Sequence, residues 1–157
     1  MALKPSYNDK LHLPGLSKTE ILILALEASQ KLEWNIEEVT PEGARFEVPF
    51  NMYSHGEEIT FTIEPGNDGE VAVRSQSSSV QFVDYGKNRK NIQKLRETME
   101  EIKTSLTPEE LTQKAKDFEE ECNRQQKKRK PIWRKKRRGT LSGRSLFPAK
   151  VLWQRLS

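Results

Sequence analysis

Residues 59–74 read ITFTIEPGNDGEVAVR, and this stretch decides the fold. Apolar residues alternate with threonines along 59–63, which is the period of a strand with one buried face. Residues 65–69 carry the proline, glycine, asparagine and aspartate that favour a tight turn. Val71 and Val73 then resume the alternation. The stretch therefore predicts a β-hairpin with one face available for packing.

Two further strands are expected before this hairpin. Residues 46–52 alternate apolar and polar side chains, and Pro49 within them indicates an edge or a bulge because proline cannot donate to a strand ladder. Residues 34–39 have weaker strand character. Turn residues at 40–43 and 55–57 separate the segments. Together with the hairpin, the pattern predicts a meander of four antiparallel strands.

Helical segments are predicted on both sides of the strands. Residues 17–20, Ser-Lys-Thr-Glu, have the form of a capping box and begin a predicted helix over 18–33. A second predicted helix begins at Asp84 and carries one continuous apolar stripe to Leu106. Residues 107–110, Thr-Pro-Glu-Glu, repeat the capping signal and start a third helix, whose stripe ends at Cys122.

The order of these elements predicts an α+β fold. We expect an antiparallel four-stranded sheet with an N-terminal helix and one or two C-terminal helices on one face, followed by a basic tail. The corresponding division is a lead-in segment at 1–16, an α+β domain at 17–122 and a flexible or amphipathic basic tail at 123–157.

Charge is distributed unevenly along the chain. Up to Glu121 the sequence holds 14 Lys and Arg against 23 Asp and Glu, a net charge of −9. From Cys122 onward it holds 13 Lys and Arg and no acidic residue, a net charge of +13. The chain therefore combines an acidic body with a basic arm, and its overall pI near 9.2 describes neither part.

The sequence gives little support for catalysis, so we expect a non-enzymatic protein without cofactor, catalytic residues or metal site. His12 and His55 lie far apart, and neither has a partner at metal-ligand spacing. Cys122 is the single cysteine, which excludes an internal disulfide, and its place on the apolar stripe predicts a core thiol. No apolar run reaches the roughly 18–20 residues of a membrane span. We expect a cytoplasmic protein, free or attached peripherally to the inner face of the membrane.

The predicted start of the second helix, 84–91, reads DYGKNRKN and has unusual charge. It places cations in the first turns, where the helix dipole disfavours them unless an anion lies near. We predict an anion-binding corner beside the serine-rich connection 75–79; its members are Lys87, Asn88, Arg89, Lys90 and Asn91. The anion could be Glu57 or Glu58 within the fold, or an external phosphate or lipid headgroup. The alternative is a solvated first turn capped by Asp84.

These residues also carry a resemblance. Trp34, the run Gly56-Glu57-Glu58-Ile59, Ser75 and the helix start at 84–91 resemble a small uncharacterised bacterial domain of Bacteroidota type. The resemblance covers about residues 17–106. It implies a helix-and-strands unit with a Gly-Lys-Asn-x-x-Asn helix start, often near membrane segments, and no assigned activity. This chain lacks the transmembrane segment of the membrane-linked members.

Residues 127–138 give the strongest functional signal, with nine basic residues in twelve. Such a cluster favours an anionic bilayer, and the apolar and basic residues mixed through 146–156 suit an interfacial segment. It would equally bind nucleic-acid phosphates, with a tryptophan available for stacking. A solvated arm, or one that folds back on the acidic body, is the third alternative. A protein partner is also compatible with the pattern, and no small-molecule substrate is inferred. The predicted contact residues are Lys127, Lys128, Arg129, Lys130, Trp133, Arg134, Lys135, Lys136, Arg137 and Arg138.

Overall fold

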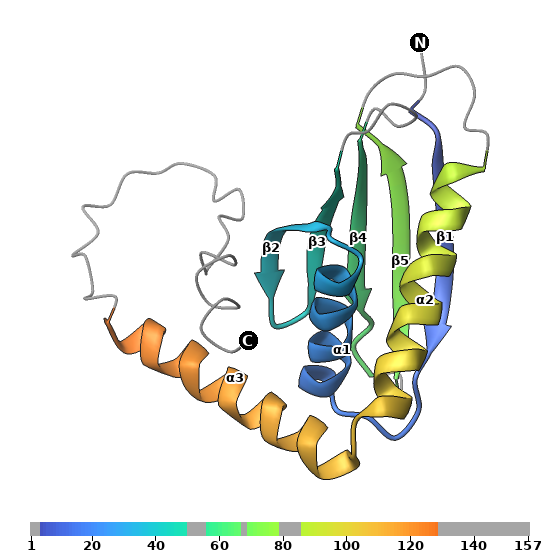
Figure 1. The fold of residues 1–157 in the computed structure, drawn as a ribbon. Helices are drawn as coiled ribbons and strands as arrows, with labels where there is room; N and C mark the ends of the chain where they lie inside the picture. Colours follow the sequence, from blue (N-terminus) through green and yellow to red (C-terminus); the bar gives the residue numbers. More distant parts are fainter. Residues whose placement is uncertain (1–3, 50–55, 67–68, 79–85, 129–157) are drawn as a thin grey trace, which may run out of the picture.

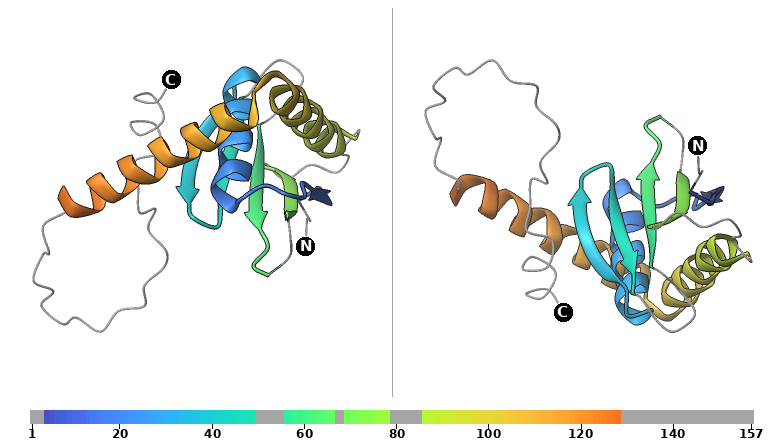
Figure 2. Two further views of the ribbon diagram at one scale, coloured as in Figure 1. Left: turned by 90° about the horizontal axis from the view of Figure 1, so that it is seen from below. Right: turned by 90° about the horizontal axis from the view of Figure 1, so that it is seen from above.

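The computed structural model describes residues 4–49, 56–66, 69–78 and 86–128. Within them an antiparallel sheet carries α1 and α2 side by side on one face, and α3 runs from the lower end of α2 past the lower end of α1 (Figures 1 and 2). The elements are β1 (Ser6–His12), α1 (Lys18–Lys31), β2 (Asn35–Thr40), β3 (Gly43–Val48), β4 (Glu57–Ile63), β5 (Glu70–Ser77), α2 (Lys87–Ser105) and α3 (Pro108–Lys128). The predicted α+β class with an antiparallel sheet is confirmed.

The sheet has five strands in the order β1-β5-β4-β3-β2, so the predicted number of four was wrong. The additional strand is β1, which pairs antiparallel with β5 from Ser6 opposite Gln76 to His12 opposite Glu70. It lies within 1–16, where the sequence predicts a lead-in without strand structure. The sequence SYNDKLH shows no clear alternation. This edge strand is therefore specified mainly by backbone pairing with β5.

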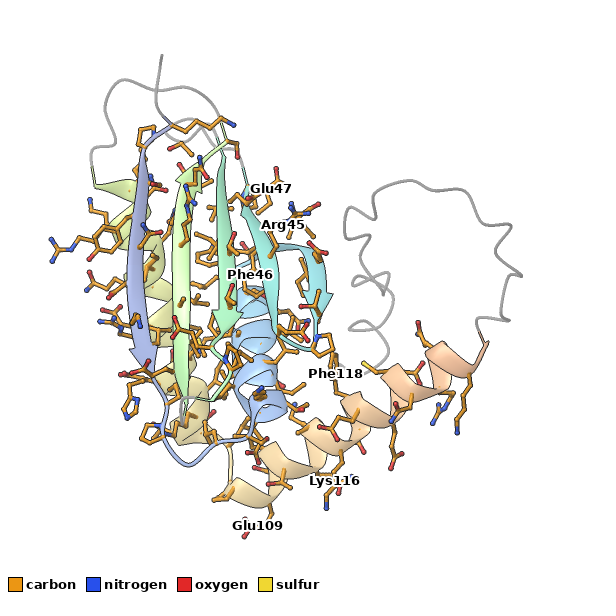
Figure 3. The ribbon with its side chains drawn as sticks, turned by 180° about the vertical axis from the view of Figure 1, so that it is seen from behind. Arg45, Phe46, Glu47, Glu109, Lys116 and Phe118 are labelled. Atoms are coloured by element: carbon orange, nitrogen blue, oxygen red, sulfur yellow. The ribbon has the colours of Figure 1, made fainter. Side chains whose placement is uncertain are left out.

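The inner strands follow the predicted alternation. Phe46 is fully buried beneath the helices, whereas its neighbours Arg45 and Glu47 are on the open face of the sheet (Figure 3). In β4, Phe61 faces the same core as Phe46. Residues 50–52, the last part of the predicted second strand, lie outside the described residues. The confirmed alternation places the core between the sheet and the helix layer.

The predicted capping box of α1 is confirmed. The Glu20 amide donates to Ser17 Oγ at 3.2 Å, and the Ser17 amide donates to Glu20 Oε2 at 2.8 Å. Partial burial acts to raise the pKa of Glu20. Hydrogen bonds from Ser17 and Thr112 outweigh this effect and hold its pKa below the usual 4.5. Helix α1 buries six consecutive side chains, 21–26, because the sheet, α2 and α3 surround it.

The two later helices differ from prediction at one end each. Helix α2 begins at Lys87 after Gly86, three residues later than the predicted start at Asp84, which lies outside the described residues. Helix α3 begins as predicted, with the Glu110 amide donating to Thr107 Oγ1 at 3.2 Å. It continues to Lys128, six residues past the end of its apolar stripe.

Candidate functional site

The first turn of α2 is the centre of the predicted anion-binding corner. Its N-cap, Gly86, has φ of 70°, a left-handed conformation that glycine adopts without the strain other residues would carry. Among the described residues no side chain caps this helix end, and the first turn of α2 holds no acidic residue. The first amides and the positive end of the helix dipole are therefore not neutralised by α2 itself.

Asn88, a predicted anion ligand, is fully buried and bonded within the protein. The Ser75 hydroxyl donates to Asn88 Oδ1 at 2.7 Å, and Asn88 Nδ2 donates to the Pro5 carbonyl at 3.2 Å. The side chain thus joins the start of α2 to β5 and to the segment that leads into β1. Its position is explained by tertiary structure without any external ligand.

Asn91 lies one turn further along and is only 8% exposed. Its Nδ2 atom is buried and lacks a hydrogen-bond partner in the described part of the chain. Leaving a buried amide donor unpaired costs about 1–3 kcal/mol. Asn91 is therefore the residue of the predicted set whose buried side-chain amide would be stabilised by a hydrogen-bond acceptor.

The three cations do not converge with the two asparagines. At about 100° per residue, Lys87, Asn88 and Asn91 share one side of α2, whereas Arg89 lies roughly opposite Asn91. Arg89 and Lys90 are exposed, and Lys87 is half-buried. The structure therefore brings together Lys87, Asn88 and Asn91, and leaves two of the predicted cations on the outer surface. Anion binding by this set stays a prediction.

Buried polar residues continue from Asn88 into the sheet. Glu57 is 2% exposed and lies opposite Ser77, which is equally buried, while Glu58 is exposed on the open face. Of the two acids proposed as internal partners, only Glu57 is thus on the helix side. We call this group the polar corner; its members are Glu57, Ser75, Ser77, Asn88 and Asn91.

The sequence placed the predicted corner beside the serine-rich connection 75–79 but did not identify Ser75 and Ser77 as buried strand residues that belong to it. Both occupy inward positions of β5, in register with Val71 and Val73. Polar residues at the alternate positions of a strand that face the core predict a buried polar contact, because a buried hydroxyl needs a nearby hydrogen-bond partner. The run of serines through 79 looks instead like a connection, which hid that signal.

Of the predicted tail residues, the structure describes only the beginning. Lys127 is exposed in the last turn of α3, and Lys128 ends that helix. Residues 129–138 lie outside the described residues. The end of α3 is the part of the described chain that extends furthest from the sheet (Figure 1). Contacts of this segment with membrane or nucleic acid stay a prediction.

The described residues also hold Cys122, which is half-buried beside the core. Burial raises its pKa to about 11, and the nearby carboxylates of Glu121 and Glu119 add to the effect. A thiol with this pKa is a weak nucleophile near neutral pH. Within 4–49, 56–66, 69–78 and 86–128, no group of three or more potential ligands could hold a metal ion. No helix in these ranges is both long and apolar enough to cross a membrane.

The fold and the polar corner define a small two-layer α+β domain with an open sheet face. A model of the family described as "Protein of unknown function (DUF1499)" matches residues 6–99, and the chain belongs to this family. The match begins at the first residue of β1 and ends within α2, so α3 and the basic segment follow the family unit. No curated protein matched the chain. The resemblance to an uncharacterised small domain is confirmed at this level.

Proposed function

We propose that this chain is a non-catalytic binding module that attaches to an anionic membrane surface through residues 127–157. The observation that carries the proposal is the run 127–138, in which nine of twelve residues are basic. The run begins in the last turn of α3, at the end of the helix that points away from the body. Lysine and arginine side chains near an anionic bilayer contribute about 1 kcal/mol each, so the cluster is sufficient for peripheral attachment.

The geometry of α3 supports this role because the acidic body would be repelled by the same surface. Cys122 still packs against the core, and Lys128 lies six residues further along α3. Six helical residues span about 9 Å. Charges are screened over about 8 Å at physiological ionic strength. Helix α3 thus holds the start of the basic run about one screening length from the point where the helix leaves the core.

The finer part of the resemblance belongs to the same proposal. A Bacteroidota-type origin, a functional Gly-Lys-Asn-x-x-Asn start at 86–91 and a place on the cytoplasmic side of a membrane are all consistent with a module that binds a surface. The polar corner would then be a structural support or a second anion contact. The buried Asn91 Nδ2, which has no hydrogen-bond partner among the described residues, favours the second role.

A nucleic-acid role is the second candidate. Trp133 lies inside the basic run, where it could stack on bases while its neighbours bind phosphates. The net charge of −9 on the body disfavours a broad nucleic-acid interface. This role would show as retention on RNA or DNA with a steep dependence on salt.

Vesicle flotation tests the membrane proposal. We expect the full chain to float with vesicles that contain phosphatidylserine and to remain in the soluble fraction with phosphatidylcholine alone. Replacing Arg134, Lys135 and Lys136 by glutamine should weaken binding about a hundredfold or more, since three contacts of about 1 kcal/mol each are lost. The matched control replaces the exposed Lys94, Lys103 and Lys116 by glutamine and should leave binding intact. Equal flotation with both lipids, or equal loss in both triple variants, would refute the proposal.

A further inference from the structure

A groove runs between α3, the start of α1 and the end of β2. It has a volume of about 300 Å³, within the range of cavities that accept small ligands or large side chains. Its floor and walls include apolar and weakly polar side chains from all three elements. The apolar part of the lining comes from Leu22, Val39, Pro41, Phe118 and Cys122, and the polar part comes from Thr19, Thr40, Glu119 and Asn123.

The groove is open because α3 touches the body along only part of its length. Thr112 donates to Glu20 at 2.8 Å, and Thr19 donates to Glu119, so polar contacts fix the first three turns of α3 against α1. Phe118 points from α3 toward the sheet, whereas Lys116 points the opposite way (Figure 3). Toward its C-terminal end α3 leads away from the sheet (Figure 1).

The last residues of the chain have a pattern that matches this groove. Residues 149–156 read AKVLWQRL, with Ala149, Leu152, Trp153 and Leu156 at the spacing of one helical face. Pro148 precedes them at a position that suits the first residue of a helix. Lys150, Val151, Gln154 and Arg155 fall on the other side. The segment is therefore an amphipathic sequence with three large apolar side chains on one face.

We infer that residues 149–156 dock in this groove of their own chain when no membrane is present. The inference rests on the proposed function, since the docked segment is part of the membrane-binding region. Docking buries the apolar side that would otherwise enter the bilayer interface, so groove and membrane compete for one segment. The acidic body thereby regulates attachment.

The length of the chain permits this contact. Twenty residues, 129–148, connect the end of α3 to the segment. A chain of that length can extend to about 66 Å. The end of α3 is six residues past Cys122 on the groove wall, or about 9 Å of helix. The segment can reach the groove without any rearrangement of α3.

Charge complementarity selects this segment over a generic apolar partner. Residues 108–122 of α3 hold two lysines against six acids, a net charge of −4. Residues 35–42, at the other side of the groove, add three glutamates and no basic residue. Residues 129–157 hold ten basic residues and no acid. Opposite net charges of this size favour docking of the segment on the body. High salt screens these charges and should weaken the docking.

Cys122 provides a natural reporter, because it lies on the groove wall and is the single cysteine of the chain. We expect its alkylation by iodoacetamide to be about tenfold slower in the full chain than in a chain ending at residue 144, which corresponds to docking worth about 1.4 kcal/mol. Leu152→Asp should react like the shortened chain. The matched control Gln154→Asp adds the same charge on the other side and should react like the full chain. Circular dichroism verifies that all four proteins are equally folded.

Adding phosphatidylserine vesicles should raise the alkylation rate of the full chain to that of the shortened chain. Equal rates in the full and shortened chains would overturn docking, and so would a protection that disappears on dilution, since it would place the segment on a second copy. Protection that persists while the protein floats with the vesicles would overturn the competition. Protection in solution with no flotation would retain docking and refute only the membrane proposal.

Discussion

Replacing Asn88 by alanine should destabilise the domain strongly, with or without any bound anion. Its side chain accepts from the Ser75 hydroxyl at 2.7 Å and donates to the Pro5 carbonyl at 3.2 Å. These two contacts join three segments that are distant in sequence. The alanine variant removes both contacts, which join the start of α2 to β5 and to the segment before β1.

The magnitude follows from the burial of the two partners. Ser75 is fully buried, so its hydroxyl loses a partner that water cannot replace, at about 1–3 kcal/mol. Pro5 is half-buried, so its carbonyl can be partly hydrated and loses about 0.5–1.5 kcal/mol. We therefore expect a decrease of about 2–4 kcal/mol in the free energy of unfolding, a large share of the stability of a small domain.

Urea unfolding followed by circular dichroism measures this change, and a double-mutant cycle with Ser75→Ala isolates the hydrogen bond. We expect a coupling energy of about 1 kcal/mol or more between the two positions. Gln93→Ala is the matched control, because this exposed amide on the same helix bonds only its neighbour Glu97 in the described structure. A loss below about 0.5 kcal/mol for Asn88→Ala, or a coupling near zero, would refute the structural role.

Three further predictions concern the corner, the helix cap and the sheet. Replacing Lys87, Arg89 and Lys90 by glutamine should change unfolding without phosphate by less than about 0.5 kcal/mol and abolish any stabilisation by phosphate; a retained phosphate effect would disprove the site. The pKa of Glu20 in the folded protein is below 4.5, so its ionised side chain stabilises the fold above that pH, and this stabilisation is lost as the pH falls through the folded pKa. Glu20→Gln should therefore reduce the loss of unfolding free energy at acid pH. If the unfolding free energies of the variant and the unchanged protein fall in parallel with pH, the Glu20 cap does not cause the acid sensitivity. Gly43→Ala would place a Cβ 2.0 Å from a main-chain oxygen of β4, so we expect a loss of about 1–3 kcal/mol or more in thermal unfolding; an unchanged midpoint would contradict the close approach.

The local patterns of the chain were sufficient to predict most of its elements. Alternation at 59–63 and 71–73 identified the central hairpin, because a strand with one buried face imposes a period of two on its side chains. The capping boxes at Ser17 and Thr107 located two helix starts to the residue, since both partners of such a box lie within one turn. Charge counts alone divided the chain into an acidic body and a basic arm.

The tertiary structure decided what local patterns do not encode. Strand β1 forms because its backbone pairs with β5, and the weak alternation of its own residues does not predict a strand. The sequence suggests both Asn88 and Asn91 as ligands for an anion. The tertiary structure shows that Asn88 is bonded to Ser75 and Pro5, whereas Asn91 Nδ2 has no partner among the described residues. The groove beside Cys122 depends on the angle at which α3 leaves α1, and that angle is set by contacts between residues about a hundred positions apart, Thr19 with Glu119 and Thr112 with Glu20. Such contacts depend on the complete chain, because neither partner carries a local signal of the other.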